Sequence, residues 1–248
     1  MISVCIATYN GGKYIKDELL SIIPQLHEND EIIISDDGSS DDTIAQVESL
    51  KDSRIKVFNN TRHDSSKKPG WNVTKNFENA LIHANGDYVF LADQDDIWMP
   101  NKINVCLNAL STNDLIIHEM ALFIGDNLED LHKNHWNGKF HFRNFLLSDG
   151  KYFGCSMAFK RKVLDWSLPF PNDLLLHDYW IGIMAELCGK VSFISEPLIK
   201  YRLHGGNVSL VSPNSFIEKI WYRLYIILNY INKFIKVKIK NRLCKSQY

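Results

Sequence analysis

The first hundred residues alternate between short apolar runs and longer segments whose apolar residues recur every three or four positions. The short runs predict buried strands at residues 2–7, 31–35, 54–58 and 87–92. The longer segments predict helices at residues 14–23, 43–50 and 73–84. Strands that are apolar at consecutive positions are typical of a parallel sheet covered by helices on both faces. This order of elements predicts an α/β fold with a mostly parallel sheet.

The rest of the chain is less regular, apart from a distinct C-terminal segment. We expect strands at residues 115–124, 154–159, 191–194 and 198–203, and a helix at residues 178–188. From Asn214 onward the apolar residues are spaced by four and three positions, which predicts an amphipathic helix. Its apolar seam consists of Ile217, Trp221, Leu224, Leu228, Ile231 and Ile235. The expected organisation is a globular domain over 1–212, with halves 1–100 and 101–212, and a helical tail over 213–248.

The tail also differs from the rest of the chain in charge. From Asn214 onward there are eight Lys and Arg residues and one acidic residue, Glu218, whereas the whole chain has a net charge of −1. Charge alone fits either a membrane or a nucleic acid. A basic helix with an apolar seam often lies in a membrane interface, so we expect a membrane and no nucleic acid partner. The tail could instead pack on its own domain or form a dimer seam.

The composition excludes several classes of protein. The chain has 248 residues, of which 45% are hydrophobic and 23% charged, so a disordered chain or a small disulfide scaffold is excluded. The five cysteines lie far apart without a CxxC pair, which argues against a zinc site and for a reducing compartment. Neither a signal peptide nor a membrane-spanning run is visible. We expect a cytoplasmic protein that is peripheral at the inner face of the cell membrane.

Two acidic clusters directly follow predicted strands. Asp36 and Asp37 follow the second strand, and residues 93–96 (DQDD) follow the fourth. Ligands of open α/β sheets bind beyond the carboxyl ends of the strands. Asp also favours turns, but three carboxylates within four residues repel one another unless a cation such as Mg²⁺ or Mn²⁺ neutralises them. Because both GxxxxGK[ST] and GxGxxG are absent from the sequence, we expect a nucleoside diphosphate that is held through the cation.

Two further residues have a structural and a functional interpretation. Asp178 stands at the start of the predicted 178–188 helix, where it would cap the helix and contribute about 1 kcal/mol, or act as a general base. The helix dipole would keep its carboxylate ionised. His204 follows the last predicted strand and precedes Gly205 and Gly206, which allow the backbone to approach a ligand such as a phosphate. A lone histidine is more often structural, so both interpretations stay open.

Three segments together resemble family 2 glycosyltransferases of the GT-A fold. They are residues 4–10 (VCIATYN), 35–39 (SDDGS) and 92–98 (ADQDDIW), and the resemblance covers residues 1–212. Residues 177–180 and 201–207 are similar to the bacterial rhamnosyltransferase-like subgroup. The resemblance implies an inverting transfer of one sugar from dTDP-rhamnose or a UDP-hexose, with Mn²⁺ or Mg²⁺ as cofactor. The implied acceptor is a lipid-linked saccharide of a bacterial surface polysaccharide, such as O-antigen or capsule.

The resemblance also implies a nucleotide-sugar site. Ala7 and Tyr9 would line it, with Tyr9 stacking near the nucleobase. Asp37 would accept a hydrogen bond from the pyrimidine N3–H, and Asp93 would lie near the ribose or the metal.

Metal binding and catalysis are implied for three further residues. Asp95 would hold the divalent cation on the diphosphate, and His204 would contact the metal or the diphosphate. Asp178 would deprotonate the acceptor hydroxyl. Gln94 leaves open which carboxylate touches the metal, and residues 126–148 are expected to shape the acceptor site.

Two other functions stay open. A non-catalytic subunit that binds a nucleotide sugar would not need Asp178. A nucleotidyltransferase usually carries a glycine-rich, basic N-terminal loop, whereas residues 8–13 contain one lysine.

Overall fold

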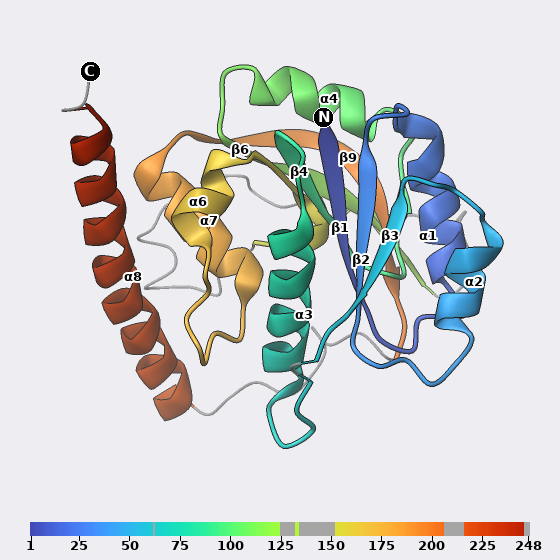
Figure 1. Ribbon diagram of the computed structural model, residues 1–248, viewed down its shortest axis with the longest axis horizontal. Coiled ribbons are helices and arrows are strands. Elements are labelled where there is room, and N and C mark those ends of the chain that lie inside the picture. Colours follow the sequence, from blue (N-terminus) through green and yellow to red (C-terminus); the bar gives the residue numbers. More distant parts are fainter. Residues whose placement is uncertain (62, 125–131, 134–151, 206–215, 246–248) are drawn as a thin grey trace.

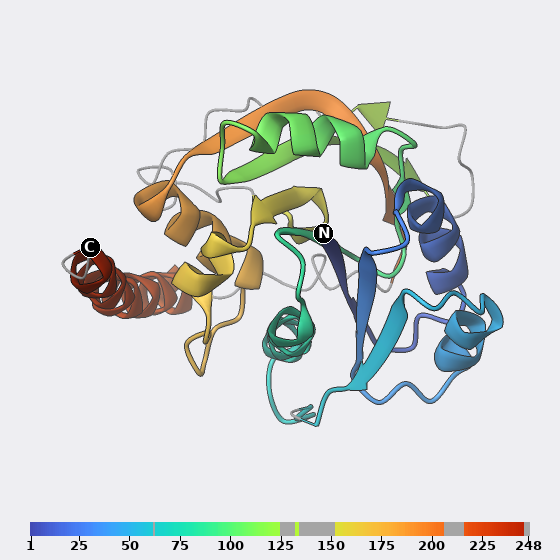
Figure 2. The same cartoon turned by 45° about the horizontal axis from the view of Figure 1, so that its top comes forward.

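The computed structural model describes residues 1–61, 63–124, 132–133, 152–205 and 216–245, with the side chains of the last helix described from 222 to 237. It is a mixed α/β structure in which helices flank a central curled sheet (Figures 1 and 2). Residues 126–148, which are expected to shape the acceptor site, lie outside the described residues, except for 132–133.

The first half of the chain confirms the predicted parallel sheet. Strands β1 (Ile2–Thr8), β2 (Glu31–Asp36), β3 (Ile55–Asn59) and β4 (Tyr88–Ala92) lie in the order β3-β2-β1-β4, and all three pairings are parallel. The connecting helices are α1 (Ile15–Ile22), α2 (Thr43–Ser49) and α3 (Pro69–His83). Consecutive strand residues enter two different cores: Cys5 packs with α3, and Val4 packs with α1. Both faces of β1 are therefore buried, which explains why its consecutive residues are apolar.

The second half continues the same sheet with mixed pairing. β8 (Met157–Lys160) pairs antiparallel with β4 and with β6 (Leu115–Ile124). β9 (Val191–Leu203) runs parallel to β6, β5 (Ile97–Trp98) pairs antiparallel with β9, and β7 (His132–Lys133) pairs with β6. β9 is one strand where the sequence predicts two, because its pairing with β6 continues past irregularities between His118 and Met120.

Several elements were not predicted from the sequence. Helices α4 (Lys102–Leu110) and α6 (Lys162–Ser167) follow β5 and β8, and short 3-10 helices lie at η1 (Ile23–Gln25) and η2 (Gly154–Ser156). The predicted helix after residue 177 is α7 (His177–Cys188). The turn at η2 brings Gly154 against the start of α7, since a Cβ on Gly154 would lie 3.0 Å from His177 Nε2 and 3.9 Å from Asp178 Cβ.

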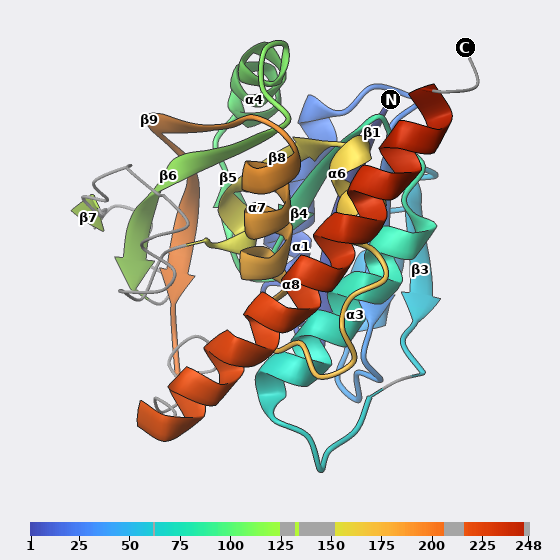
Figure 3. The ribbon, with the colours of Figure 1, turned by 90° about the vertical axis from the view of Figure 1, so that its left-hand side faces the viewer.

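The C-terminal helix α8 (Phe216–Lys245) packs against α6 and α7 (Figure 3). Its inward stripe contains Ile226, Tyr230 and Val237, which are at least nine-tenths buried. The hydroxyl oxygens of Tyr222 and Tyr225 accept hydrogen bonds from the backbone N–H groups of Leu175 (2.9 Å) and Asp173 (3.1 Å). The alternative prediction of a helix packed on its own domain therefore holds for the described residues.

The stripe that packs is not the predicted seam. Leu224, Leu228, Ile231 and Ile235 are between 45% and 67% exposed. The side chains of the other two seam residues, Ile217 and Trp221, lie outside the described part of α8. The helix has apolar side chains on two opposite faces, and only one face is covered. Among the described helices, none is both long and apolar enough to cross a bilayer.

A matched pair of substitutions tests the packing of α8. We expect Ile226→Asp to lower the free energy of unfolding by about 3 kcal/mol or more, because it places a charge in an apolar contact. We expect Leu228→Asp, two residues away on the exposed face, to change it by about 0.5 kcal/mol or less. Urea denaturation followed by circular dichroism measures both. Equal losses for the two variants would contradict the observed orientation of the helix.

Candidate functional site

The candidate site lies where β1, β2 and β4 end, at one edge of the parallel sheet. Thr8 and Asp36 pair at the ends of β1 and β2, and the N–H of Asp37 donates to the Thr8 carbonyl at 2.9 Å. The loops that follow these strands carry Tyr9, Asp37 and the acidic loop, which we define as residues 93–96. The site predicted beyond the carboxyl ends of the strands is thus built from adjacent loops.

The two neighbouring aspartates after β2 have different roles. Asp36 accepts hydrogen bonds from the backbone N–H groups of Gly38 (3.0 Å) and Ser39 (2.9 Å), and so it builds the turn. Gly38 has a φ of +85°, a conformation that favours glycine. Because Asp36 builds the turn, Asp37 can direct its carboxylate toward the adjacent loop after β3.

Asp37 is buried and both of its oxygens have partners. Asn60 Nδ2 donates to Asp37 Oδ1 at 2.6 Å, and His63 Nδ1 lies 2.7 Å from Asp37 Oδ2. The His63 ring stacks on Tyr9, with 5.4 Å between the centroids and 26° between the planes. Ala7 lies on β1, partly buried beside the sheet core. Tyr9 and Asp37 are thus brought together, and Asn60 and His63 are contacts that the sequence did not single out.

Gln94 positions the acidic loop. Its Oε1 accepts hydrogen bonds from Thr8 Oγ1 (2.6 Å) and from the Tyr9 N–H (2.9 Å), and its Nε2 donates to the Tyr9 carbonyl (3.3 Å). The amide therefore ties the loop after β4 to the loop after β1. Gln94 holds the flanking aspartates in place through contacts that only an uncharged amide supplies, since it both donates and accepts.

The end of β9 lies against the acidic loop. His204 Nε2 is 2.6 Å from Asp95 Oδ2, and Arg202 Nε donates to the Asp95 carbonyl at 2.8 Å. The Arg202 N–H donates to Asp96 Oδ1 at 3.1 Å. Tyr14 lies beside the His204 ring and beneath the Arg202 guanidinium. The structure therefore places His204 and Asp95, which are 109 positions apart, in direct contact.

Asp178 approaches the same site from α7. The helix has Leu176 at its N-cap and Asp178 in its first turn, so the interpretation of Asp178 as the N-cap is wrong. Burial raises the pKa of Asp178 to about 7, although N–H groups of Tyr179 and Gly154 favour its ionised form. Burial also raises the pKa of Asp93 to about 7, with further contributions from the charges of Asp95 and Asp178. The charge of Asp178 thus adds to the burial that disfavours ionisation of Asp93.

Two fully buried ionisable groups, Lys102 and Glu18, lie behind the acidic loop. Lys102 of α4 has no exposed surface, and its ammonium donates to the Cys155 carbonyl at 2.8 Å and lies 3.8 Å from the centre of the Trp98 ring. Glu18 of α1 is equally buried, and burial followed by the charge of Asp96 raises its pKa well above the ordinary value. Burial therefore favours the neutral form of Glu18, and burial also lowers the pKa of Lys102.

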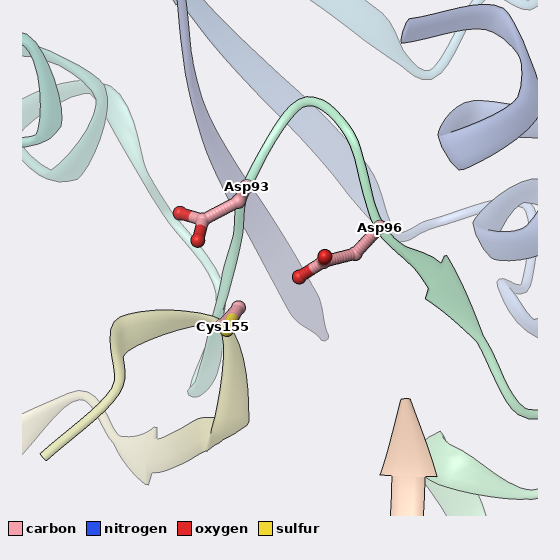
Figure 4. Close-up of side chains that lie close together, drawn as sticks. All are labelled: Asp93, Asp96 and Cys155. Carbon is pink, nitrogen blue, oxygen red and sulfur yellow. The ribbon is translucent and has the colours of Figure 1, made fainter. Parts of the chain in front are cut away.

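Two groups of side chains offer metal ligands. Asp93, Asp96 and Cys155 each place one ligand atom within 4.8 Å of the others (Figure 4). Asp96 and Cys155 are almost completely buried, and burial raises the pKa of the Cys155 thiol and of the Asp96 carboxyl well above their ordinary values. Asp95 and His204 fit better, because they lie in contact at a partly exposed position and offer an oxygen and an imidazole nitrogen. Such a donor pair suits a divalent ion such as Mn²⁺.

Comparison with protein families gives one match that covers most of the chain. The model of "Glycosyl transferase family 2" matches residues 3–166. This range contains β1 to β4, the acidic loop and Gly154.

Curated relatives with similar sequences include two bacterial glycosyltransferases. The Escherichia coli UDP-Glc:alpha-D-GlcNAc-diphosphoundecaprenol beta-1,3-glucosyltransferase WfgD is 28% identical, with 93% of this chain and 92% of that protein covered. The Shigella flexneri dTDP-rhamnosyl transferase RfbG is also 28% identical, with 98% of this chain and 86% of that protein covered.

Solved structures share the fold. S. aureus TarS 1–349 in complex with UDP-GlcNAc superposes with a TM-score of 0.69 at 23% identity, covering 92% of this chain and 66% of that one. The chain therefore has the GT-A fold that its sequence predicts. Other structures with this fold include complexes with Mn²⁺.

Proposed function

The chain belongs to glycosyl transferase family 2, and we propose that it transfers one sugar from a nucleoside-diphosphate donor to a hydroxyl group with inversion. The observation that carries this proposal is the position of Asp178 beside the acidic loop. A Cβ on Gly154 would lie 3.9 Å from Asp178 Cβ, and the next residue, Cys155, has its sulfur within 4.8 Å of carboxylate oxygens of Asp93 and Asp96. A carboxylate opposite a diphosphate site is the arrangement that a single displacement requires, because the base and the leaving group act on opposite sides of the sugar.

The donor site would lie between Tyr9 and Asp37. A pyrimidine ring can stack on Tyr9, which is half exposed, while its N3–H donates to an Asp37 oxygen. Uracil and thymine carry this N–H, which supports a UDP or dTDP donor. The names of the two curated relatives contain UDP-Glc and dTDP-rhamnosyl, so UDP-hexoses and dTDP-rhamnose are the proposed donors.

Asp95 and His204 would hold the divalent cation, Mn²⁺ or Mg²⁺, while Asp93 lies beside them near the ribose. When bound, this ion offsets negative charge on the leaving diphosphate. Arg202 holds the backbone of Asp95 and the carboxyl of Asp96 in place. The contacts of Arg202 and His204 with Asp95 would thus keep the two proposed ligands together.

Asp178 would act as the general base. With a pKa of about 7, a large fraction of its carboxyl groups is ionised at neutral pH and can still accept a proton readily. It takes the proton of the acceptor hydroxyl as the new C–O bond to the sugar forms and the bond to the diphosphate breaks. The Tyr179 N–H, 2.8 Å from Asp178 Oδ1, keeps the carboxylate oriented.

The proposed acceptor is a lipid-linked saccharide at the inner face of the cell membrane, in the synthesis of a surface polysaccharide. WfgD, by its name, acts on a diphosphoundecaprenol-linked sugar. The exposed stripe of α8 (Leu224, Leu228, Ile231 and Ile235) supports membrane contact. Residues 222–237 contain three basic residues and no acidic one, which favours an anionic lipid surface. The protein would then be cytoplasmic and peripheral to the membrane.

The role of Asp178 is tested by Asp178→Asn. We expect kcat to fall about 10³-fold or more, because no base remains, while donor binding stays nearly unchanged. In the unaltered protein kcat should fall as the pH drops below about 7, since protonated Asp178 cannot accept a proton. Initial rates with UDP-glucose or dTDP-rhamnose and a synthetic GlcNAc-diphospholipid measure both effects. Asp173→Asn, at an exposed position just before α7, is the control. Equal loss of donor binding in Asp178→Asn would argue against a base.

The metal site is tested by Asp95→Asn. We expect Mn²⁺ to increase the affinity of the unaltered protein for UDP, and EDTA to remove this increase. The variant should bind UDP equally weakly with Mn²⁺ and with EDTA in titration calorimetry. Asp87→Asn, at the opposite end of β4, should behave like the unaltered protein. Retained metal dependence in Asp95→Asn would place the ligands elsewhere.

Membrane contact is tested on the exposed face of α8. We expect the double variant Leu228→Asp, Ile231→Asp to lose co-sedimentation with phosphatidylglycerol vesicles while its circular dichroism spectrum stays unchanged. Leu20→Asp, at an equally exposed leucine of α1, should still co-sediment. If the double variant sediments as well as the unaltered protein, this stripe does not bind the membrane.

A further inference from the structure

The His63 ring makes the two contacts that a nucleobase would make in the donor site. It stacks on Tyr9 with a centroid distance of 5.4 Å, and its Nδ1 lies 2.7 Å from Asp37 Oδ2. An ionised carboxylate only accepts hydrogen bonds, so Nδ1 must carry a proton and donate it. A pyrimidine that stacks on Tyr9 in the place of His63 and donates its N3–H to Asp37 would use the same two partners.

A planar ring with an N–H therefore already stands in the slot between Tyr9 and Asp37. The second Asp37 oxygen accepts from Asn60 Nδ2 at 2.6 Å, so each oxygen already has a partner. A base that stacks on Tyr9 where the His63 ring now lies reaches Asp37 Oδ2 only after that ring has moved. Asn60 follows β3 directly, and its N–H donates to the Asp36 carbonyl at 2.7 Å, which fixes its position. The His63 side chain is 31% exposed and is the donor that can leave toward solvent.

The backbone next to His63 is anchored independently of the ring. The Asp64 N–H donates to Asn72 Oδ1 at 3.0 Å, and Asn72 Nδ2 donates to the Asp64 carbonyl at 3.0 Å. Asn72 belongs to α3, so the loop stays attached to the helix when the ring moves. Rotation of the His63 side chain alone would open the slot.

We infer that His63 occupies the nucleobase slot of the free protein and is displaced by the base of the donor, so that His63 sets the affinity for the nucleotide. This inference rests on the proposed function, because it takes the slot between Tyr9 and Asp37 as the donor's base site. Each nucleotide that binds must break the stack with Tyr9 and the hydrogen bond to Asp37. The measured affinity is reduced by the free energy of these two contacts.

The test is UDP binding by titration calorimetry in the presence of Mn²⁺. We expect His63→Ala to bind UDP about five-fold more tightly than the unaltered protein, because the resident ring is absent. His63→Phe, which keeps a ring and removes the N–H, should also bind more tightly, but by a smaller factor. His27→Ala, at an exposed histidine far from the slot, should leave the affinity unchanged. In the unaltered protein, the NMR signals of the His63 ring should shift on adding UDP as the ring leaves Tyr9.

Each outcome decides a different point. Equal or weaker UDP binding by His63→Ala would overturn the inference alone, since His63 would then be a wall of the site that stays in place. An unaltered protein that binds neither UDP nor dTDP would overturn the proposed donor site and this inference with it.

Discussion

The crowding of carboxyl groups at one edge of the sheet is the constraint on which the rest of the site depends. Three aspartates share the acidic loop, Glu18 lies behind it, and Asp178 approaches from α7. Like charges in a poorly solvated region raise one another's pKa and oppose folding. The protein limits this cost with the buried side chain of Lys102, with Arg202 bound to the loop, and with burial that raises the pKa of Glu18 and Asp96 and so favours their neutral forms.

The same arrangement separates carboxyl groups of one chemical type into different roles. The carboxylate of Asp36 accepts hydrogen bonds within the turn that follows β2, whereas the carboxylate of Asp37 points toward His63 beside Tyr9. Within the acidic loop, Asp96 is held by Arg202 and points into the interior, whereas Asp95 meets His204 at a partly exposed position. Environment, and not residue type, therefore decides which carboxyl groups stabilise the loop and which are available for a ligand.

Much of the first half could be predicted from the sequence, because its elements follow local rules. Apolar runs of strand length and helical spacing located β1 to β4 and the helices between them, and the clusters after β2 and β4 indicated the candidate site. The pattern of Ile103, Cys106 and Leu110 has helical spacing, yet α4 was not predicted. The contacts of Asn60, His63, Gln94 and Lys102 were not predicted either, since each side chain acts through a partner that is distant along the chain.

In the C-terminal tail, the sequence by itself determined the secondary structure, and only the tertiary structure decided which helix face is buried. The spacing of apolar residues determined that the segment forms a helix, because that spacing depends on neighbours within two turns. It did not determine which face packs, because α8 has apolar side chains on both faces and the hydrophobic effect has no direction. The face that contains Ile226 packs against α6 and α7. Hydrogen bonds from loop N–H groups to the hydroxyls of Tyr222 and Tyr225 also hold the helix in this orientation. In this orientation the apolar seam that contains Leu228 is exposed.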